Sequence, residues 1–203
     1  MKILELFAGT GSVGKVAKQL GYEVTSLDIT EKYSKVDILI DILEWDYKIY
    51  QPKHFDIIWA SPPCDTFSKL QDTNRHKTAE EKLDRIYKIG LPLLYKSLEI
   101  ITYLQPKYYI IENPQTGKMK DFLKLPFVDI DYCKFGFNYR KRTRFWTNIK
   151  NLETVKCLKN NPCESRGKTN RHPIRICYYN SSKLKERYSI PSNLIEYLFK
   201  SCV

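Results

Sequence analysis

Short apolar runs recur along the chain, separated by stretches in which apolar residues return every three or four positions. The runs cover residues 2–7, 22–27, 36–40, 55–60 and 107–111. Apolar runs of this length are typical of strands buried on both faces of a parallel sheet. The stretches between them have the periodicity of amphipathic helices. This alternation predicts an α/β fold with a mostly parallel, doubly wound sheet.

The strongest helix signal spans residues 78–103. Thr78 and Glu81 form a capping box, which satisfies free backbone N–H groups at the start of a helix. Apolar residues then recur at helical spacing, and Gly90 and Pro92 are expected to kink the helix. A long helix in this position would cover one face of the sheet.

A glycine-rich turn follows the first run. Gly9, Gly11 and Gly14 fit the pattern of dinucleotide-binding folds, where glycine lets the backbone approach a ligand closely and turn into a helix. Asp28 ends the second run and is placed to accept hydrogen bonds from ribose hydroxyls. A nicotinamide enzyme and a methyltransferase both fit this pattern. A turn or helix cap is the alternative role for Asp28.

Asp41 and Ile42 follow the third run. A carboxylate at this position could reach an adenine amino group, and the isoleucine could cover the ring. Asp41 could equally cap the segment 43–50.

The fourth run leads into Pro62, Pro63 and Cys64. Cys64 is therefore expected just past the carboxyl end of a strand, the edge where open α/β sheets bind ligands. Two prolines fix the backbone and stiffen the loop. Most free cysteines are buried and inert, but a rigid loop that presents one thiol at this edge favours a nucleophile.

The fifth run ends in Glu112, Asn113 and Pro114. In a parallel sheet Glu112 and Cys64 would come from the ends of neighbouring strands on the same side. A carboxyl group beside a thiol provides a hydrogen-bonding group for a substrate nitrogen and a nucleophile for an adjacent carbon. The alternative for Glu112 is a structural ion pair.

Composition limits the cellular context. The chain has 203 residues, 42% of them hydrophobic, which suits one buried core. No stretch approaches the roughly 20 apolar residues of a membrane span, and no secretory signal opens the chain. Six irregularly spaced cysteines fit a reduced, intracellular protein, so we expect the cytoplasm or nucleus.

The net charge of +11 is concentrated between Lys134 and Arg175, where Glu153 and Glu164 are the only carboxylates. Aromatic residues are interleaved with these cations, a combination that favours nucleic acid over a merely solvated surface. Arginines alternate along the expected strand that ends near Ile149, so they would share one face of it. They are Arg140, Arg142 and Arg144.

Cysteine and histidine recur in the basic stretch 151–185, at Cys157, Cys163, His172 and Cys177. Their spacing does not match regular zinc sites, so we predict no bound metal. The expected organisation is a catalytic domain over residues 1–149, a short basic segment over 150–187, and a C-terminal helix over 188–203 that packs back on the catalytic domain.

Taken together, these motifs resemble the C5-cytosine DNA methyltransferase family, especially its compact viral and phage members. Leu6 to Gly11 is similar to the family's first motif, and Pro62-Pro63-Cys64 with Phe67-Ser68 to its catalytic motif. Glu112-Asn113 is similar to the base-holding motif, and Arg142 with Arg144 to the arginine motif.

The resemblance implies a Rossmann-like, S-adenosylmethionine-dependent methyltransferase that adds a methyl group to C5 of cytosine in double-stranded DNA. Cys64 would attack C6 of a flipped-out base, Glu112 would hold the base, and Arg142 and Arg144 would assist, with Arg144 favouring the thiolate. The residues expected to bind the cofactor are Phe7, Ala8, Gly9, Thr10, Gly11, Asp28, Ile29, Asp41, Ile42 and Pro62. The residues expected to bind nucleic acid are Ser68, Arg140, Lys141, Arg166, Lys168 and Arg171.

The chain also departs from the family pattern. Asp65, Arg140 and Pro114 replace the usual glutamine, glutamine and valine, and the region 149–187 is far shorter than a full target-recognition domain. We therefore expect short or relaxed sequence preference and allow for an accessory protein. Open alternatives are the same reaction on RNA, methylation of an amino nitrogen, a catalytically silent nucleic-acid-binding protein, and the nicotinamide enzyme.

Overall fold

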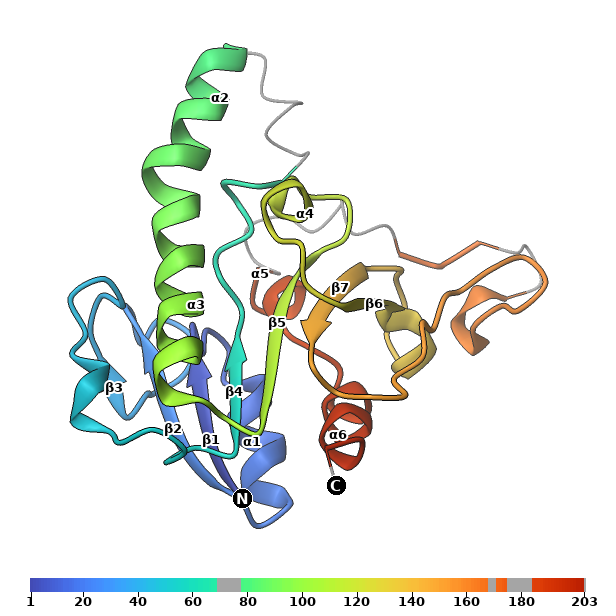
Figure 1. The fold of residues 1–203 in the computed structure, drawn as a ribbon. Helices are drawn as coiled ribbons and strands as arrows, with labels where there is room; N and C mark the ends of the chain where they lie inside the picture. Colours follow the sequence, from blue (N-terminus) through green and yellow to red (C-terminus); the bar gives the residue numbers. More distant parts are fainter. Residues whose placement is uncertain (69–77, 168–170, 175–183, 203) are drawn as a thin grey trace.

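The computed structural model describes residues 1–68, 78–167, 171–174 and 184–202. Within these residues, seven strands form one sheet in the order β3-β2-β1-β4-β5-β7-β6 (Figure 1). Neighbouring strands run parallel from β3 to β5, whereas β7 is antiparallel to both β5 and β6. The strands are β1 (Lys2–Leu6), β2 (Glu23–Asp28), β3 (Ile38–Leu39), β4 (Ile57–Ala60), β5 (Tyr108–Pro114), β6 (Phe127–Asp131) and β7 (Arg142–Thr147).

Helices cover both faces of the sheet. One face packs against η3 (Ile86–Gly90) and α3 (Leu91–Leu104). α2 (Ala79–Arg85), which has no buried residue, extends the same helical stretch beyond the sheet, in green (Figure 1). The other face packs against α1 (Ser12–Gln19) and α6 (Ser192–Lys200). Side chains of successive strand residues alternate between the two apolar layers, as expected for a sheet buried on both sides.

The predicted α/β architecture is confirmed, with local differences. The capping box at Thr78 and Glu81 is present. The expected kink takes the form of a single π-helical turn over Ile86–Gly90. The third strand is only two residues long, because the Asp37 carboxylate accepts hydrogen bonds from the Ser26 backbone and hydroxyl in place of regular strand pairing.

Shorter helical segments connect these elements. They are η1 (Tyr47–Ile49), α4 (Met119–Phe122), η4 (Tyr132–Phe135), η5 (Glu164–Arg166) and α5 (Leu184–Tyr188). The basic segment begins by running along β6: Val155 forms a bridge with Ile130, and its backbone exchanges hydrogen bonds with Asp129 and Asp131. No helix among the described residues is long and apolar enough to cross a membrane.

The register of the parallel strands determines where functional groups meet. Leu6 lies opposite Ala60, and Ala60 lies opposite Ile111. The turn after β1, the loop after β4 and the polar end of β5 therefore lie side by side at one edge of the sheet.

Candidate active site

A cavity of about 320 Å³ lies at the carboxyl edge of the parallel strands. The turn after β1 and the end of β2 form one part of its wall, and the Cys64 loop and Glu112 form another. The segment before α6 contributes Tyr188 and Ile190. The lining residues are Glu5, Phe7, Ala8, Gly9, Thr10, Ser12, Val13, Asp28, Ile29, Thr30, Tyr33, Ser61, Pro63, Cys64, Asp65, Glu112, Pro114, Lys141, Tyr188 and Ile190.

The turn after β1 has an unusual backbone that brings main-chain groups to the cavity. Phe7, Gly9 and Gly11 all have positive φ angles, of 59°, 50° and 65°. Glycine adopts this left-handed conformation without strain. The Asp28 carboxylate fixes the turn, since Oδ2 accepts a hydrogen bond from the Gly9 N–H at 2.8 Å and Oδ1 accepts one from the Thr30 N–H at 3.0 Å.

The buried side chain of Glu5 lies beneath this turn. No role was predicted for this residue from the sequence. Its Oε2 accepts a hydrogen bond from the Gly14 N–H at 2.9 Å. Burial raises the pKa of Glu5 to about 8, so the side chain is largely protonated at neutral pH. A Cβ atom on residue 14 would lie 2.7 Å from the same oxygen, which explains the glycine at this position.

Most of the residues predicted to bind the cofactor gather at the cavity. Phe7, Ala8, Gly9, Thr10, Asp28 and Ile29 line it. Gly11 does not line the cavity but shapes the turn through its positive φ angle. Pro62 is buried beside the cavity, and its carbonyl oxygen accepts a hydrogen bond from Asn113 Nδ2 at 2.9 Å.

Asp41 and Ile42, also predicted to bind the cofactor, are not among the residues that line this cavity. Asp41 Oδ1 accepts a hydrogen bond from the Leu43 N–H at 2.9 Å, so the carboxylate stabilises a local turn. The Ile42 side chain is buried in the core on the α3 side. The structure thus shows the local capping contact that was the alternative for Asp41, and this contact leaves Oδ2 available to a ligand.

The Cys64 loop is held firmly on both sides. Phe67 is buried against Gly90, where a Cβ atom would come within 2.7 Å of its ring. Asp65 forms an ion pair with Arg85 of α2 at 3.1 Å. The thiol faces the cavity in a half-buried position. Burial raises the pKa of Cys64, the positive charge of Lys141 lowers it, and the negative charge of Glu112 raises it.

Glu112, Tyr132 and Lys141 form a compact group beside this thiol. The Tyr132 hydroxyl, fully buried, donates a hydrogen bond to Glu112 Oε1 at 3.1 Å. Lys141 Nζ lies 3.9 Å from the same oxygen and 4.8 Å from the centre of the Tyr132 ring. Lys141 also donates a hydrogen bond to the Arg187 carbonyl at 3.3 Å, which ties the group to the segment before α6.

The two arginines predicted to assist catalysis point elsewhere. On β7, Phe145 pairs with Glu112 across the sheet, so alternation turns Arg142 and Arg144 towards the opposite face. Each forms a two-pronged ion pair with β6, Arg142 with Asp131 at 2.8 and 2.9 Å and Arg144 with Asp129 at 2.7 and 3.0 Å. Neither residue lines the cavity. Lys141 provides the positive charge that we had assigned to Arg144.

The residues predicted to bind nucleic acid are spread over a wider surface. Arg140 and Arg171 are exposed, and Ser68 and Arg166 are half-buried. Lys141 is the member of this set that lines the cavity. Lys168 lies outside the described residues.

Sequence patterns missed the aromatic wall of the cavity. Tyr33 and Tyr188 pack edge to face with ring centres 5.9 Å apart. Tyr188 reaches this position because α6 docks beside α1, and Ile190 N–H donates a hydrogen bond to Ser12 Oγ at 3.3 Å. No local motif predicts a contact between residues so far apart in sequence.

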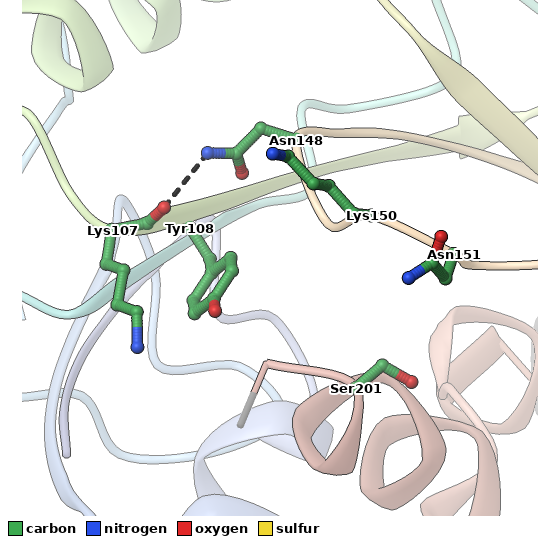
Figure 2. A pocket seen from close by; sticks show the side chains of 6 residues that line it. All are labelled: Lys107, Tyr108, Asn148, Lys150, Asn151 and Ser201. Carbon is green, nitrogen blue, oxygen red and sulfur yellow. Dashed lines mark hydrogen bonds between the residues drawn. The ribbon is translucent and has the colours of Figure 1, made fainter.

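A second cavity lies near the start of β5, at the opposite end of this strand from Glu112 (Figure 2). Asn148 organises it: the side-chain amide donates a hydrogen bond to the Lys107 carbonyl and accepts one from the Tyr109 N–H, both at 2.9 Å. The described lining consists of Lys107, Tyr108, Asn148, Lys150, Asn151 and Ser201. Because this lining has neither a thiol nor a carboxyl group, the Cys64 cavity is the candidate active site.

Comparison with known proteins agrees with this assignment. The family model described as C-5 cytosine-specific DNA methylase matches residues 1–122. A protein of Frog virus 3 (isolate Goorha), named "Probable DNA (cytosine-5)-methyltransferase", is 43% identical over 173 residues, which cover 80% of this chain and 78% of the viral protein.

A solved structure shows the same fold at low sequence identity. A prophage-encoded candidate DNA modification methyltransferase of E. coli aligns with a TM-score of 0.52 at 15% identity, over 72% of this chain and 46% of that chain. Spodoptera frugiperda DNMT2 aligns with a TM-score of 0.47 at 16% identity, over 76% of this chain and 54% of that chain. The chain thus spans about half the length of these two structures. On the family match and the viral relative, the chain belongs to the C-5 cytosine-specific DNA methylase family.

Proposed function

We propose that this protein transfers a methyl group from S-adenosylmethionine to C5 of cytosine in DNA, with Cys64 as the covalent nucleophile. One observation carries the proposal: the Cys64 thiol, the Glu112 carboxyl group and the glycine-rich turn after β1 line the same cavity. The family match and the name of the viral relative support the same reaction.

The cavity fits the cofactor on chemical grounds. The left-handed turn at Gly9 and Gly11 leaves room for a ligand against the backbone, and Asp28 at the end of β2 is an acceptor for ribose hydroxyls. Ile29 lies beside it with 67% of its surface exposed, which leaves an apolar face for an adenine ring. S-adenosylmethionine bound here would supply an activated methyl group.

Cys64 would make C5 of the base reactive. The thiolate forms a bond to C6, and the electron pair displaced from the C5–C6 double bond makes C5 nucleophilic. After methylation, the C5 proton passes to water as the bond between sulfur and C6 breaks, which regenerates the thiolate. Because burial raises the pKa of Cys64, Lys141 is needed to favour the reactive form.

Glu112 would hold the base while this occurs. Its carboxyl group can hydrogen-bond the N3 position and the exocyclic amine of cytosine, and the hydrogen bond from Tyr132 fixes its orientation. Glu112 would therefore hold the N3 and amino edge of the pyrimidine, and Cys64 would act on C6, the ring carbon opposite N3.

The substrate would be double-stranded DNA with the target base flipped out of the stack. Neither C5 nor C6 can reach Cys64 while cytosine is paired in the duplex, so the base must flip out. Unpairing and unstacking it costs a few kcal/mol. Exposed basic side chains of the 134–175 region, such as Arg140, Lys159 and Arg171, would contact phosphates and make binding strongly dependent on salt. A recognition region this short supports relaxed sequence preference or an accessory protein that supplies specificity.

The test measures transfer of labelled methyl from S-adenosylmethionine to unmethylated DNA and to RNA, with the position mapped by bisulfite sequencing. We expect label at C5 of cytosine in DNA and none with Cys64→Ala. Label only in RNA would change the substrate class. Cofactor binding without transfer to either nucleic acid would indicate a silent binding protein, and transfer that survives Cys64→Ala would exclude the covalent mechanism.

A further inference from the structure

Three cysteines and a histidine gather behind the active site, on the outer side of β6. They are Cys133, Cys157, Cys163 and His172, and their ligand atoms all lie within 4.8 Å of one another. The three thiols are 1–6% exposed, and no disulfide joins them. Buried thiols converging on an imidazole ring are unusual for side chains that only fill space.

The two distances from the imidazole to its nearest thiols are close to those around a single tetrahedral ion, and the four ligand atoms together lie within 4.8 Å of one another. His172 Nε2 lies 3.3 Å from Cys163 Sγ and 3.7 Å from Cys157 Sγ. A regular zinc site keeps its ligand atoms about 3.5–3.8 Å apart, given typical zinc–sulfur and zinc–nitrogen bonds. Three thiolates and one imidazole are a donor set that selects zinc over the hard cations calcium and magnesium.

The surroundings hold the ligands in place and balance their charge. The Cys157 N–H donates a hydrogen bond to Asp131 Oδ2 at 2.8 Å, and Ser165 Oγ lies 3.2 Å from Cys163 Sγ. Three thiolates around a divalent ion leave one net negative charge, and Arg166 Nη1 lies 3.9 Å from Cys157 Sγ. Supporting groups of this kind orient ligands in known metal sites.

The connection between Cys157 and Cys163 is a tight turn. Leu158 and Asn161 exchange backbone hydrogen bonds at 3.1 and 3.3 Å. Lys134 Nζ donates hydrogen bonds to Asn161 Oδ1 at 2.8 Å and to the Pro162 carbonyl at 3.0 Å. The turn is thus fastened to η4, the element that carries Cys133.

We propose that Cys133, Cys157, Cys163 and His172 bind one structural zinc ion. The ion fastens the start of the basic segment to η4, immediately after the strand that pairs with β7. This differs from the sequence prediction of no metal, because Cys133 comes from a separate element and completes the set. Cys177, which the sequence pattern included, lies outside the described residues.

The site would also support the base-holding group. Tyr132 precedes Cys133 in η4, and its hydroxyl is the donor to Glu112. Loss of zinc would loosen η4 and with it the orientation of Glu112. The metal proposal itself does not depend on the proposed function, since its primary readout is metal content.

The test measures zinc by mass spectrometry in the full-length protein, purified without chelators. We expect about one zinc ion per chain in the native protein and in the controls Cys64→Ser and Cys202→Ser, and less than a tenth of that in Cys157→Ser and Cys163→Ser. Cys202 is a matched control because it is also buried, but in the apolar core between the sheet and α6, away from the other thiols. Cobalt substituted for zinc should give the absorption bands of tetrahedral thiolate coordination.

A second measurement on the native chain covers the case in which ligand variants fail to fold. Alkylation followed by peptide mapping should find Cys133, Cys157 and Cys163 protected until a chelator is added. A folded native protein that stays metal-free after equilibration with zinc would overturn the proposal. Equal alkylation with and without chelator would also overturn the proposal. If Cys177→Ser lost as much zinc as Cys157→Ser, the assignment of the four ligands would be wrong.

Discussion

The active-site cysteine and a cluster of three other cysteines lie in contrasting environments. Cys64 is a single half-buried thiol that lines an open cavity, with Lys141 as the positive charge and Glu112 as the neighbouring carboxyl group. Cys133, Cys157 and Cys163 are buried together around one imidazole. In the first arrangement the thiol lines a cavity that can admit a substrate, whereas the second matches the ligand set of the proposed zinc site.

The contrast shows that neighbours, and not burial alone, determine what a thiol can do. Burial raises the pKa of Cys64, which by itself disfavours the thiolate. A nearby lysine counteracts burial in the active site, whereas a divalent cation would do so in the cluster. Tyr132 and Cys133 are adjacent in η4, so the two environments are mechanically linked.

The largest expected effect is the loss of methyl transfer on replacing Cys64, and it distinguishes the active-site thiol from the three clustered thiols. Cys64→Ala should reduce methyl transfer by about 10³-fold or more, because no other described thiol lines the cavity, while zinc content stays unchanged. Cys163→Ser should lose the zinc. Transfer assays and metal analysis on the same preparations test both variants. A Cys64→Ala variant that lost zinc would show that the two cysteine environments are not independent.

Glu112→Gln should reduce transfer by about 10²-fold or more. The amide can still hydrogen-bond the edge of the base, but it has no acidic proton to transfer to N3 while charge builds up on the ring. Cofactor binding, measured by calorimetry, should remain within a few fold of the native value. A variant with normal turnover would show that Glu112 is structural.

Tyr132→Phe tests the link between the environments. Removing the hydrogen bond to Glu112 Oε1 should lower turnover by about tenfold, while zinc content stays at the native level. Turnover is measured at saturating DNA, so that a binding defect is not mistaken for loss of orientation. Unchanged turnover would mean that η4 does not position Glu112.

Lys141→Gln should shift the pH dependence of transfer. Lys141 lowers the pKa of Cys64, so its removal raises that pKa and moves the rise in activity to higher pH. Each unit of rise lowers the thiolate population tenfold on the acidic side of the profile. Lys141→Arg keeps the charge and serves as the control; identical profiles for Gln and Arg would exclude the electrostatic role.

Arg144→Met should have the smallest effect on chemistry and a clear effect on stability. It leaves Asp129, which is 4% exposed, without its two-pronged partner, at a cost of about 3 kcal/mol in the free energy of unfolding. Denaturant unfolding measures the cost. Transfer per folded molecule should stay near native, and a large loss there would restore the catalytic role first predicted for this arginine.

The sequence was sufficient to predict the fold and the two principal site residues. Buried parallel strands have a clear pattern, and polar groups at their carboxyl ends must meet at one edge. Cys64 and Glu112 each follow such a strand directly, so their convergence needed no information beyond local sequence.

Other features depended on long-range geometry. Alternation indicated that Arg142 and Arg144 share a face but not which face the cavity uses, and that depends on the pairing of Phe145 with Glu112. Asp41 could bind adenine or cap a turn, and its contact with the Leu43 N–H depends on how the chain turns after β3, which local sequence does not show. The cluster was missed because Cys133 comes from η4 and meets the others through long-range contacts, among them the bridge of Val155 to β6 and the hydrogen bonds of Lys134 to the 158–162 turn.

The central claim is that Cys64 forms the covalent bond to cytosine, and trapping tests it most directly. DNA containing 5-fluorocytosine cannot lose the C5 substituent as a proton, so the adduct should persist after methyl transfer and survive a denaturing gel. We expect a cofactor-dependent protein–DNA band for the native protein, a DNA-linked peptide that contains Cys64, and no band for Cys64→Ser. An active native protein that forms no adduct, or an adduct that persists in Cys64→Ser, would contradict the account.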